Sequence, residues 1–246
     1  SLRIDKKEQG ETSFRQFSPF LTNVEDTALV ALNSLVRNSL FFNRSGRVFF
    51  MEWTWQDSRN KMLLSNGFES RVNKSMALRA RWNLNRNVSA ELQTSSGIRE
   101  NFAAFFLNRN YRIESFSLDP VICYQSGNRW RLSLFYGYSA NDNTLGASGE
   151  NAVIQKGGLE FRYSIPGKGN LTGKYQLSNI SYPFDLNTPL AFEMLEGLSS
   201  GTNNLWNLSW QQNLNAWLQL SINYHGRNSQ ARQAIHSGTM QVRALF

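Results

Sequence analysis

The first candidates for chemistry are two histidines near the C-terminal end, because no other histidine occurs among the 246 residues. Ser221 and Asn223 lie close to His225 in the sequence, and Ser237 directly follows His236. A histidine that takes the proton of a serine hydroxyl is the centre of many hydrolytic sites. Such a site also needs an acid that orients the imidazole, and neither histidine has one placed to do so. We therefore expect no catalytic residue. A hydrolase of the phospholipase or protease kind that uses His225 and His236 remains an alternative.

The sequence contains no pattern typical of a metal or cofactor site. One cysteine, Cys123, and two histidines are too few for a zinc site, and the acids are not clustered at ligand spacing. The polar stretch 141–149 has Asp142 as its only acid before Glu150, which favours a solvated loop over a calcium site. No phosphate-binding loop or dinucleotide motif is present. We expect neither a metal nor a cofactor.

Basic residues outnumber acidic ones, with 26 Lys and Arg against 18 Asp and Glu and a net charge of +8. Such an excess can indicate a nucleic-acid partner, but nucleic-acid-binding proteins gather their cations in one patch or stripe. Here the cations are spread over many separate segments. We therefore expect no nucleic-acid partner, and the role of the charges depends on the elements that carry them.

Those elements are predicted to be β-strands, because apolar and polar residues alternate in one segment after another. This period of two places successive side chains on opposite faces of a strand. Aromatic residues at 13% and only five prolines also favour strands. The apolar row of the terminal strand consists of Met240, Val242, Ala244 and Phe246. We expect twelve strands, at residues 32–43, 47–57, 61–72, 75–85, 87–98, 115–125, 129–140, 151–164, 170–181, 204–212, 216–226 and 236–246.

The strand lengths predict a membrane barrel. The mean hydropathy is −0.44, and no apolar run approaches the ~18 residues of a membrane-spanning helix. A barrel strand alternates in polarity and crosses the bilayer with ~9–11 residues, which is about the length of most of the expected strands. A soluble all-β surface domain also alternates in polarity and is a further alternative.

The lengths of the connections support the barrel. Counted back from the C-terminus, the links at 213–215, 166–169, 126–128 and 85–87 are short. The links between them are long and polar, at 227–235, 182–203, 141–150 and 99–114. Bacterial barrels have short periplasmic turns and longer extracellular loops. The rule fails at 43–46 and 73–74, which are short where long loops are expected.

In a barrel, the two rows of each strand face the lumen and the lipid. A cation that faces lipid at the midplane costs ~2–4 kcal/mol, so the charged row must face the lumen. There it could make an electropositive passage, or its Arg–Glu pairs could fill the lumen and seal it. The expected lumen-facing charges are Arg79, Arg81, Glu91, Arg129, Arg131, Lys156, Glu160, Arg162, Lys174 and Arg243.

Aromatic residues on the apolar row fall near the expected strand ends, where barrels carry girdles at the membrane interfaces. The expected interface aromatics are Trp53, Trp55, Trp82, Trp130, Tyr136, Tyr138, Tyr163, Trp210 and Phe246. Glu193 and Glu196 could form a carboxylate pair. We expect them instead on a short amphipathic turn or strand extension that packs over the barrel mouth.

The segments 190–198, 201–210, 224–227 and 236–246 resemble the C-terminal end of large, mostly uncharacterised outer-membrane proteins of Gram-negative bacteria. The resemblance covers roughly the last 200 residues. It implies a bacterial outer-membrane location and is consistent with a longer protein of which these residues are the C-terminal part, but it brings no catalytic residues. The terminal strand ending in Phe246 is similar to the one that the barrel-assembly machinery recognises.

We therefore expect an all-β fold, an antiparallel transmembrane up-and-down β-barrel of about twelve strands that ends in the Phe246 strand. Residues 1–31 are expected to form an N-terminal linker, plug or periplasmic segment, and residues 32–246 the barrel. The expected function is non-enzymatic: a porin-like pore, a subunit of a transport or secretion complex, or a membrane anchor. The expected partners are outer-membrane lipid, lipopolysaccharide and the barrel-assembly machinery, with the C-terminus on the periplasmic side.

Overall fold

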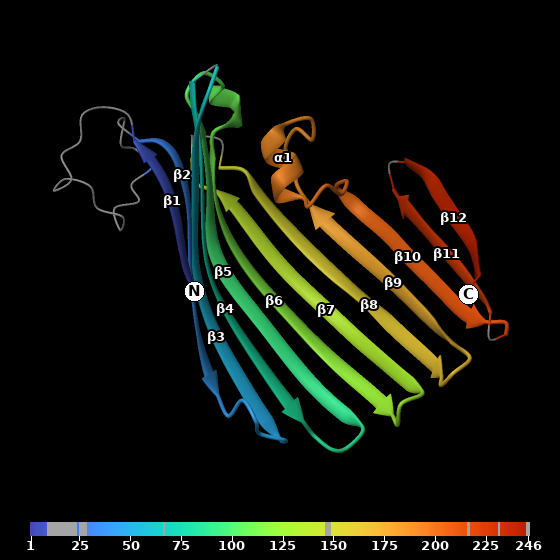
Figure 1. The fold of residues 1–246 in the computed structure, drawn as a ribbon. Helices are drawn as coiled ribbons and strands as arrows, with labels where there is room; N and C mark the ends of the chain where they lie inside the picture. Colours follow the sequence, from blue (N-terminus) through green and yellow to red (C-terminus); the bar gives the residue numbers. More distant parts are fainter. Residues whose placement is uncertain are drawn as a thin grey trace.

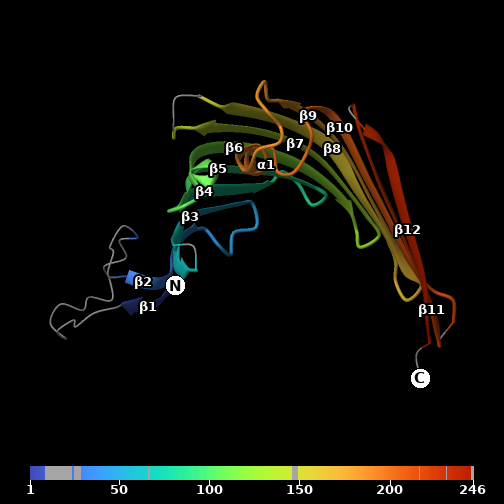
Figure 2. The ribbon, with the colours of Figure 1, turned by 90° about the horizontal axis from the view of Figure 1, so that it is seen from above.

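The computed structural model describes residues 1–8, 24, 29–65, 67–145, 149–215, 217–230 and 232–244. These residues form one sheet of twelve strands in sequence order, each antiparallel to the next (Figure 1). The fold is therefore all-β with up-and-down topology, as predicted. Seen from above, the sheet curves into an open arc (Figure 2). Among the described residues, β1 and β12 do not pair, so the sheet does not close.

Each strand is bounded by turn residues or a loop. The strands are β1 (Leu2–Glu8), β2 (Leu29–Phe42), β3 (Phe49–Leu64), β4 (Gly67–Asn83), β5 (Val88–Ala103), β6 (Tyr111–Ser126), β7 (Trp130–Asn143), β8 (Asn151–Ile165), β9 (Gly169–Ser181), β10 (Gly201–Asn213), β11 (Leu218–Ser229) and β12 (Arg232–Ala244). A 3₁₀ turn, η1 (Leu107–Arg109), precedes β6, and one short helix, α1 (Pro189–Met194), lies between β9 and β10. Within the described residues, no helix is long and apolar enough to span a membrane.

The count of twelve strands is as expected, but the N-terminal strands differ from the prediction. The expected strands 47–57, 61–72 and 75–85 are two longer strands, β3 and β4. The turn predicted at 73–74 lies within β4, where Asn73 and Lys74 pair with Ser58 and Asp57 of β3. Polar residues in mid-strand were misread as a turn. The strand that brings the total to twelve is β1, at the N-terminus, which pairs with β2. Its sequence shows no sustained alternation of apolar and polar residues, so it was not predicted.

These longer strands explain why the loop rule failed at the N-terminal end. With β3 and β4 as observed, the 43–48 connection lies at the same end of the sheet as the other short turns, at 84–87, 127–129, 166–168 and 214–217. The opposite end carries the longest described connection, 182–200. Two links at that end are nevertheless only two residues long, at 65–66 and 230–231. The long loop expected at 227–235 is therefore wrong, because β11 and β12 continue through most of it.

The helix α1 lies inside the arc (Figure 2), and a small hydrophobic core forms between it and the sheet at the long-loop end. Thr188 caps α1 by accepting a hydrogen bond from the backbone N–H of Ala191 at 3.0 Å. The buried side of α1 packs on the concave face of β6, β8 and β9, which agrees with the turn expected over the mouth. The core consists of Ile113, Ala152, Ile154, Ile180, Tyr182, Ala191, Met194 and Leu195.

Candidate functional site

The concave face of the sheet is the polar face. Because α1 packs on Ile154 and Ile180, strand alternation places Lys156 and Lys174 on the same, concave side. On each strand, the residues that alternate with the concave ones face outward, and many of them are large, apolar and exposed. This convex row includes Leu92, Ile122, Leu132, Leu134, Leu159, Leu177, Leu208, Met240 and Val242. The terminal-strand residues Met240, Val242 and Ala244 share the convex row, whereas Phe246 lies outside the described residues.

Two ion pairs join concave charges across the middle of the sheet. Arg79 donates to both carboxylate oxygens of Glu91, with Nε–Oε1 at 2.7 Å and Nη2–Oε2 at 3.1 Å. Lys156 Nζ lies 3.7 Å from Asp119 Oδ1, although β7 runs between their strands. The residue of β7 at that point is Gly137, where a Cβ atom would lie 2.5 Å from Lys156 Cε and 2.7 Å from Asp119 Oδ1. The absence of a side chain at Gly137 therefore gives this ion pair room to form.

Lys174 is held in a different way. Its ammonium nitrogen lies 5.1 Å from the centroid of the Phe135 ring, which is within cation–π distance. Glu160 stands opposite Lys174 in the β8–β9 register, but no ion pair links them. The Phe135 ring in turn lies over Gly158, where a Cβ atom would come within 2.6 Å of Phe135 Cζ.

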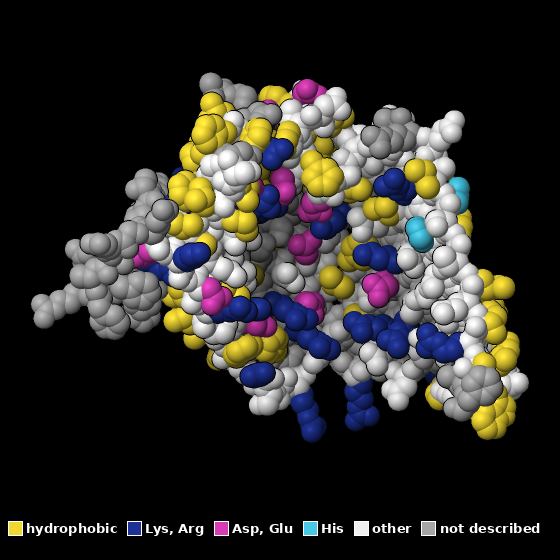
Figure 3. Space-filling model, turned by 45° about the horizontal axis from the view of Figure 1, so that its top comes forward, with side chains coloured by type: hydrophobic (Ala, Val, Ile, Leu, Met, Phe, Trp, Pro, Cys, Tyr) yellow, Lys and Arg dark blue, Asp and Glu magenta, His cyan; other side chains and the backbone are white. Residues whose placement is uncertain are grey.

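The short-turn end of the concave face carries arginines without carboxylate partners. Figure 3 looks into this face and shows Lys and Arg side chains gathered along its lower part, with Asp and Glu mostly above them. We call six arginines at this end the arginine band: Arg47, Arg81, Arg86, Arg129, Arg131 and Arg162. Within the described part of the chain, none of the six makes an ion pair.

Two hollows follow the arginine band. One, of about 190 Å³, is lined by Gln125, Gly127, Asn128, Arg129, Trp130, Arg131, Arg162 and Ser164. The other, of about 450 Å³, is lined by Arg47, Val48, Arg81, Asn83, Leu84, Asn85, Arg86, Asn87, Val88, Ser89 and Gln125. Gln125 lines both hollows, and neither contains a carboxylate. Both are therefore lined by cations and hydrogen-bond donors with no competing negative charge.

The two histidines lie on opposite faces of the sheet. In the β11–β12 register His225 pairs with Ser237, and Gly226 pairs with His236. His225 lines a concave hollow of about 530 Å³ with Lys174 and Arg227. His236 is convex, where Tyr224 Oη lies 2.8 Å from its Nδ1. The two imidazoles therefore cannot act on one substrate, and the geometry offers the hydrolase alternative no shared site. In the described part of the chain, no cluster of potential ligands could hold a metal ion.

The aromatics singled out in the sequence lie on the convex face, except for Phe246, which is outside the described residues. Trp82, Trp130, Tyr163 and Trp210 lie near the short-turn end, and the rings of Trp130 and Tyr163 are 4.3 Å apart between centroids. Trp53 and Trp55 lie further along β3, opposite Leu78 and Met76. Tyr136 and Tyr138 lie within β7. Trp217, which is exposed in the β10–β11 turn, was not among the predicted interface aromatics, because the expected strand 216–226 placed it on the polar row.

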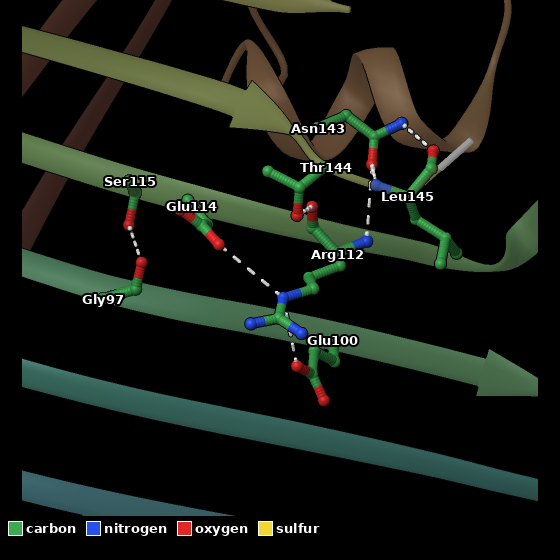
Figure 4. A network of polar contacts seen from close by, with 8 residues as sticks. All are labelled: Gly97, Glu100, Arg112, Glu114, Ser115, Asn143, Thr144 and Leu145. Atoms are coloured by element: carbon green, nitrogen blue, oxygen red, sulfur yellow. Dashed lines mark hydrogen bonds and ion pairs between the residues drawn. The ribbon is translucent and has the colours of Figure 1, made fainter. Parts of the chain in front are cut away.

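The sequence reading also missed a charged zone on the convex face at the long-loop end. Arg112 Nε lies 3.5 Å from Glu100 Oε1 and 3.7 Å from Glu114 Oε1 (Figure 4). Glu114 pairs in register with Asp142 of β7, so the zone continues across the sheet. These residues fall in or beside the loop predicted at 99–114, since a strand with polar residues on both faces shows no alternation. On β6 and β7 the apolar part of the convex surface therefore lies nearer the short turns than this charged zone.

Solved structures share this fold at low sequence identity. Against the siderophore receptor PirA from Pseudomonas aeruginosa the TM-score is 0.57 at 10% identity, covering 88% of this chain and 37% of the receptor. Against the outer-membrane channel DcaP of Acinetobacter baumannii it is 0.53 at 9% identity, covering 99% of this chain and 71% of the channel. The chain thus spans little more than a third of the receptor's length. No protein-family profile and no curated protein matches the sequence.

The twelve antiparallel strands, their two-sided polarity and these structural neighbours define the class: the fold is that of an outer-membrane β-barrel. This is the fold that the alternation of apolar and polar residues predicts.

Proposed function

We propose that the protein is a non-enzymatic, integral outer-membrane β-barrel whose concave face lines a passage for solutes. The observation that carries this proposal is the polarity of the sheet, with exposed Leu, Ile and Trp outside and paired and unpaired charges inside. In lipid, the apolar side must face outward, because a cation at the bilayer midplane costs ~2–4 kcal/mol. The similarity of the fold to a channel and a receptor supports a role in transport.

A planar-bilayer recording tests the passage directly. Purified protein inserted into a bilayer should produce discrete conductance steps. If it inserts but conducts no current, the barrel is sealed and serves as an anchor or as a subunit of a transport or secretion complex. In that case α1 and concave ion pairs such as Arg79–Glu91 and Lys156–Asp119 are the groups that fill the lumen.

The orientation we propose puts the short turns and the C-terminus in the periplasm, with 104–110 and 182–200 outside. The convex face supports this, since its apolar part lies toward the short turns and its charged part lies where lipopolysaccharide headgroups would be. Leu107→Cys in the β5–β6 connection should react with a membrane-impermeant maleimide on intact cells, and Asn128→Cys in the β6–β7 turn should not. Both variants are made with Cys123→Ser, and the reverse labelling pattern would invert the orientation.

Both free edges of the sheet must be paired in the membrane. Backbone groups in hydrocarbon need hydrogen-bond partners, so an open edge is not stable there. Either β12 pairs with β1, or further strands lie between them. A set of paired cysteines, one in β1 and one in β12, would yield a disulfide within one chain in the first case only. Insertion itself should depend on the barrel-assembly machinery, which is the first partner to look for in mild-detergent purification.

Two alternative functions, a hydrolase and a soluble surface domain, can each be tested. If the protein cleaved lipid or peptide bonds through its histidines, replacing His225 and His236 together by Asn would abolish that activity. Because the two rings face opposite sides of the sheet, we expect no such activity to lose. A soluble surface domain would leave the membrane fraction without detergent, whereas the exposed apolar convex face predicts that detergent is required.

A further inference from the structure

We propose that the hollow beside the β6–β7 turn binds a small oxyanion of the phosphate type. This inference deepens the proposed passage by naming a class of solute, and it rests on that function only for the route by which the anion arrives. The hollow of about 190 Å³ is lined by three arginines, Arg129, Arg131 and Arg162, and by no carboxylate.

The register of the sheet brings two of these arginines together. Arg131 of β7 stands directly opposite Arg162 of β8, and both side chains lie on the concave face. Residues in such positions have Cβ atoms about 5 Å apart, and like charges placed there destabilise the sheet. An oxyanion between the two would remove this repulsion. Guanidinium groups also bind phosphate and carboxylate oxygens with two parallel hydrogen bonds, which adds geometric selectivity.

The turn holds the third arginine at the same place. The backbone N–H of Ser164 donates to the carbonyl of Arg129 at 2.8 Å, which ties the turn to β8. Gln125, opposite Arg131 on the other side, donates through Nε2 to the carbonyl of Gly127 at 3.1 Å. The backbone around the hollow is thus fixed by hydrogen bonds that leave the three guanidinium groups available.

Acidic residues elsewhere on the concave face do not neutralise this hollow. Glu91 and Asp119 are engaged with Arg79 and Lys156. Glu160 is two residues before Arg162 on the same face, and it stands opposite Lys174 rather than Arg131 in the register. Among the residues that the structure describes, it makes no ion pair with the arginines of the hollow. Arg79 and Lys156 are therefore paired with carboxylates in the middle of the concave face, whereas the arginines of the hollow at its short-turn end are unpaired among the described residues.

The size of the hollow favours a single small anion over an acidic macromolecule. Gln125 connects it to the larger hollow that contains Arg47, Arg81 and Arg86. An anion could therefore move along the rim from one donor set to the next without meeting a carboxylate of either lining.

Equilibrium dialysis of the purified, folded protein in detergent with radiolabelled inorganic phosphate tests the site. The variant carrying Arg131→Gln and Arg162→Gln should bind phosphate at least about tenfold more weakly, since it loses two charge-assisted donors. Arg112→Gln removes one charge from the convex face and, as the matched control, should leave binding unchanged within about twofold. A second variant, Arg131→Lys with Arg162→Lys, keeps the charge and should still bind more weakly than the natural protein, because the fork geometry is lost.

The inference is overturned if phosphate does not bind, if the double Gln variant binds as well as the natural protein, or if Arg112→Gln weakens binding equally. Heat-modifiable migration on a gel verifies that each variant is folded. Dialysis measures binding without any passage across a membrane. Phosphate binding without conductance would refute the proposed passage and support the anion site. Conductance without phosphate binding would support the passage and refute the anion site.

Discussion

The guanidinium group of Arg79 holds both carboxylate oxygens of Glu91 across β4 and β5, at 2.7 and 3.1 Å. Arg81 stands directly opposite the same glutamate in the register and has no ion-pair partner among the described residues. Glu91 therefore pairs with Arg79, which is further from the short-turn rim, and leaves Arg81 unpaired although Arg81 stands directly opposite it.

Replacing Glu91 by Gln should make the concave face more positive without unfolding the barrel. The side chain of Arg79 is 46% exposed, and pairs of this kind contribute about 1 kcal/mol or less. We expect the reversal potential in a salt gradient to shift toward anion preference. The urea midpoint should change little. A shift toward cation preference would mean that these residues do not line the passage.

The ion pair over Gly137 can be tested with a double-mutant cycle. Gly137→Ala places a methyl group where Lys156 and Asp119 now meet, and Asp119→Asn removes the pair directly. Each change should cost about 1 kcal/mol or less. Because both act on the same interaction, their effects on the free energy of unfolding should not add. Full additivity would show that Gly137 serves another purpose.

The α1 core should unfold locally without loss of the barrel. Met194 is fully buried in this core, and truncation to Ala at such a site costs about 2–5 kcal/mol. Met194→Ala should increase protease cleavage within 182–200, while Phe192→Ala, at a side chain 67% exposed on the same helix, should not. Equal cleavage in both variants would contradict the packing described for α1.

The convex face predicts a position-dependent penalty for a new cation. Leu134 is 60% exposed in the apolar part of β7, and Asp142 lies on the same face near the long-loop end. Leu134→Arg should cost ~2–4 kcal/mol in a bilayer and reduce folded protein in vesicles. Asp142→Arg should be tolerated. Urea unfolding in vesicles measures both, and equal penalties would refute the proposed limit of the apolar zone.

Tyr182 predicts that the α1 core loosens in alkali. Burial, and secondarily the charge of Glu150, raise the pKa of the Tyr182 phenol above its usual 10.0. A raised pKa means that the folded core retains this proton more strongly, so its contribution is complete below pH 10.0 and is lost as pH rises through the folded value. Protease cleavage of 182–200, followed from about pH 8 to pH 11, should rise in the natural protein. Tyr182→Phe should flatten that rise, and an unchanged profile would exclude this phenol as the cause.

The sequence alone determined the fold class and the two faces of the sheet, because alternation in strands such as β7 and β12 reflects two different environments. Prediction from the sequence failed where the two faces of a strand do not differ in polarity. Asn73 and Lys74 were mistaken for a turn inside β4, and the polar ends of β5, β6 and β11 were mistaken for loops.

Only the tertiary structure decided which charges meet. Register brings Arg131 opposite Arg162 and separates His225 from His236, and a one-residue slip would reverse both relationships. The Lys156–Asp119 pair depends on a glycine in the strand between them, a relationship set by neighbours that are distant in the sequence. The alternating pattern specifies a face for each side chain, whereas the pairing of strands specifies its neighbours.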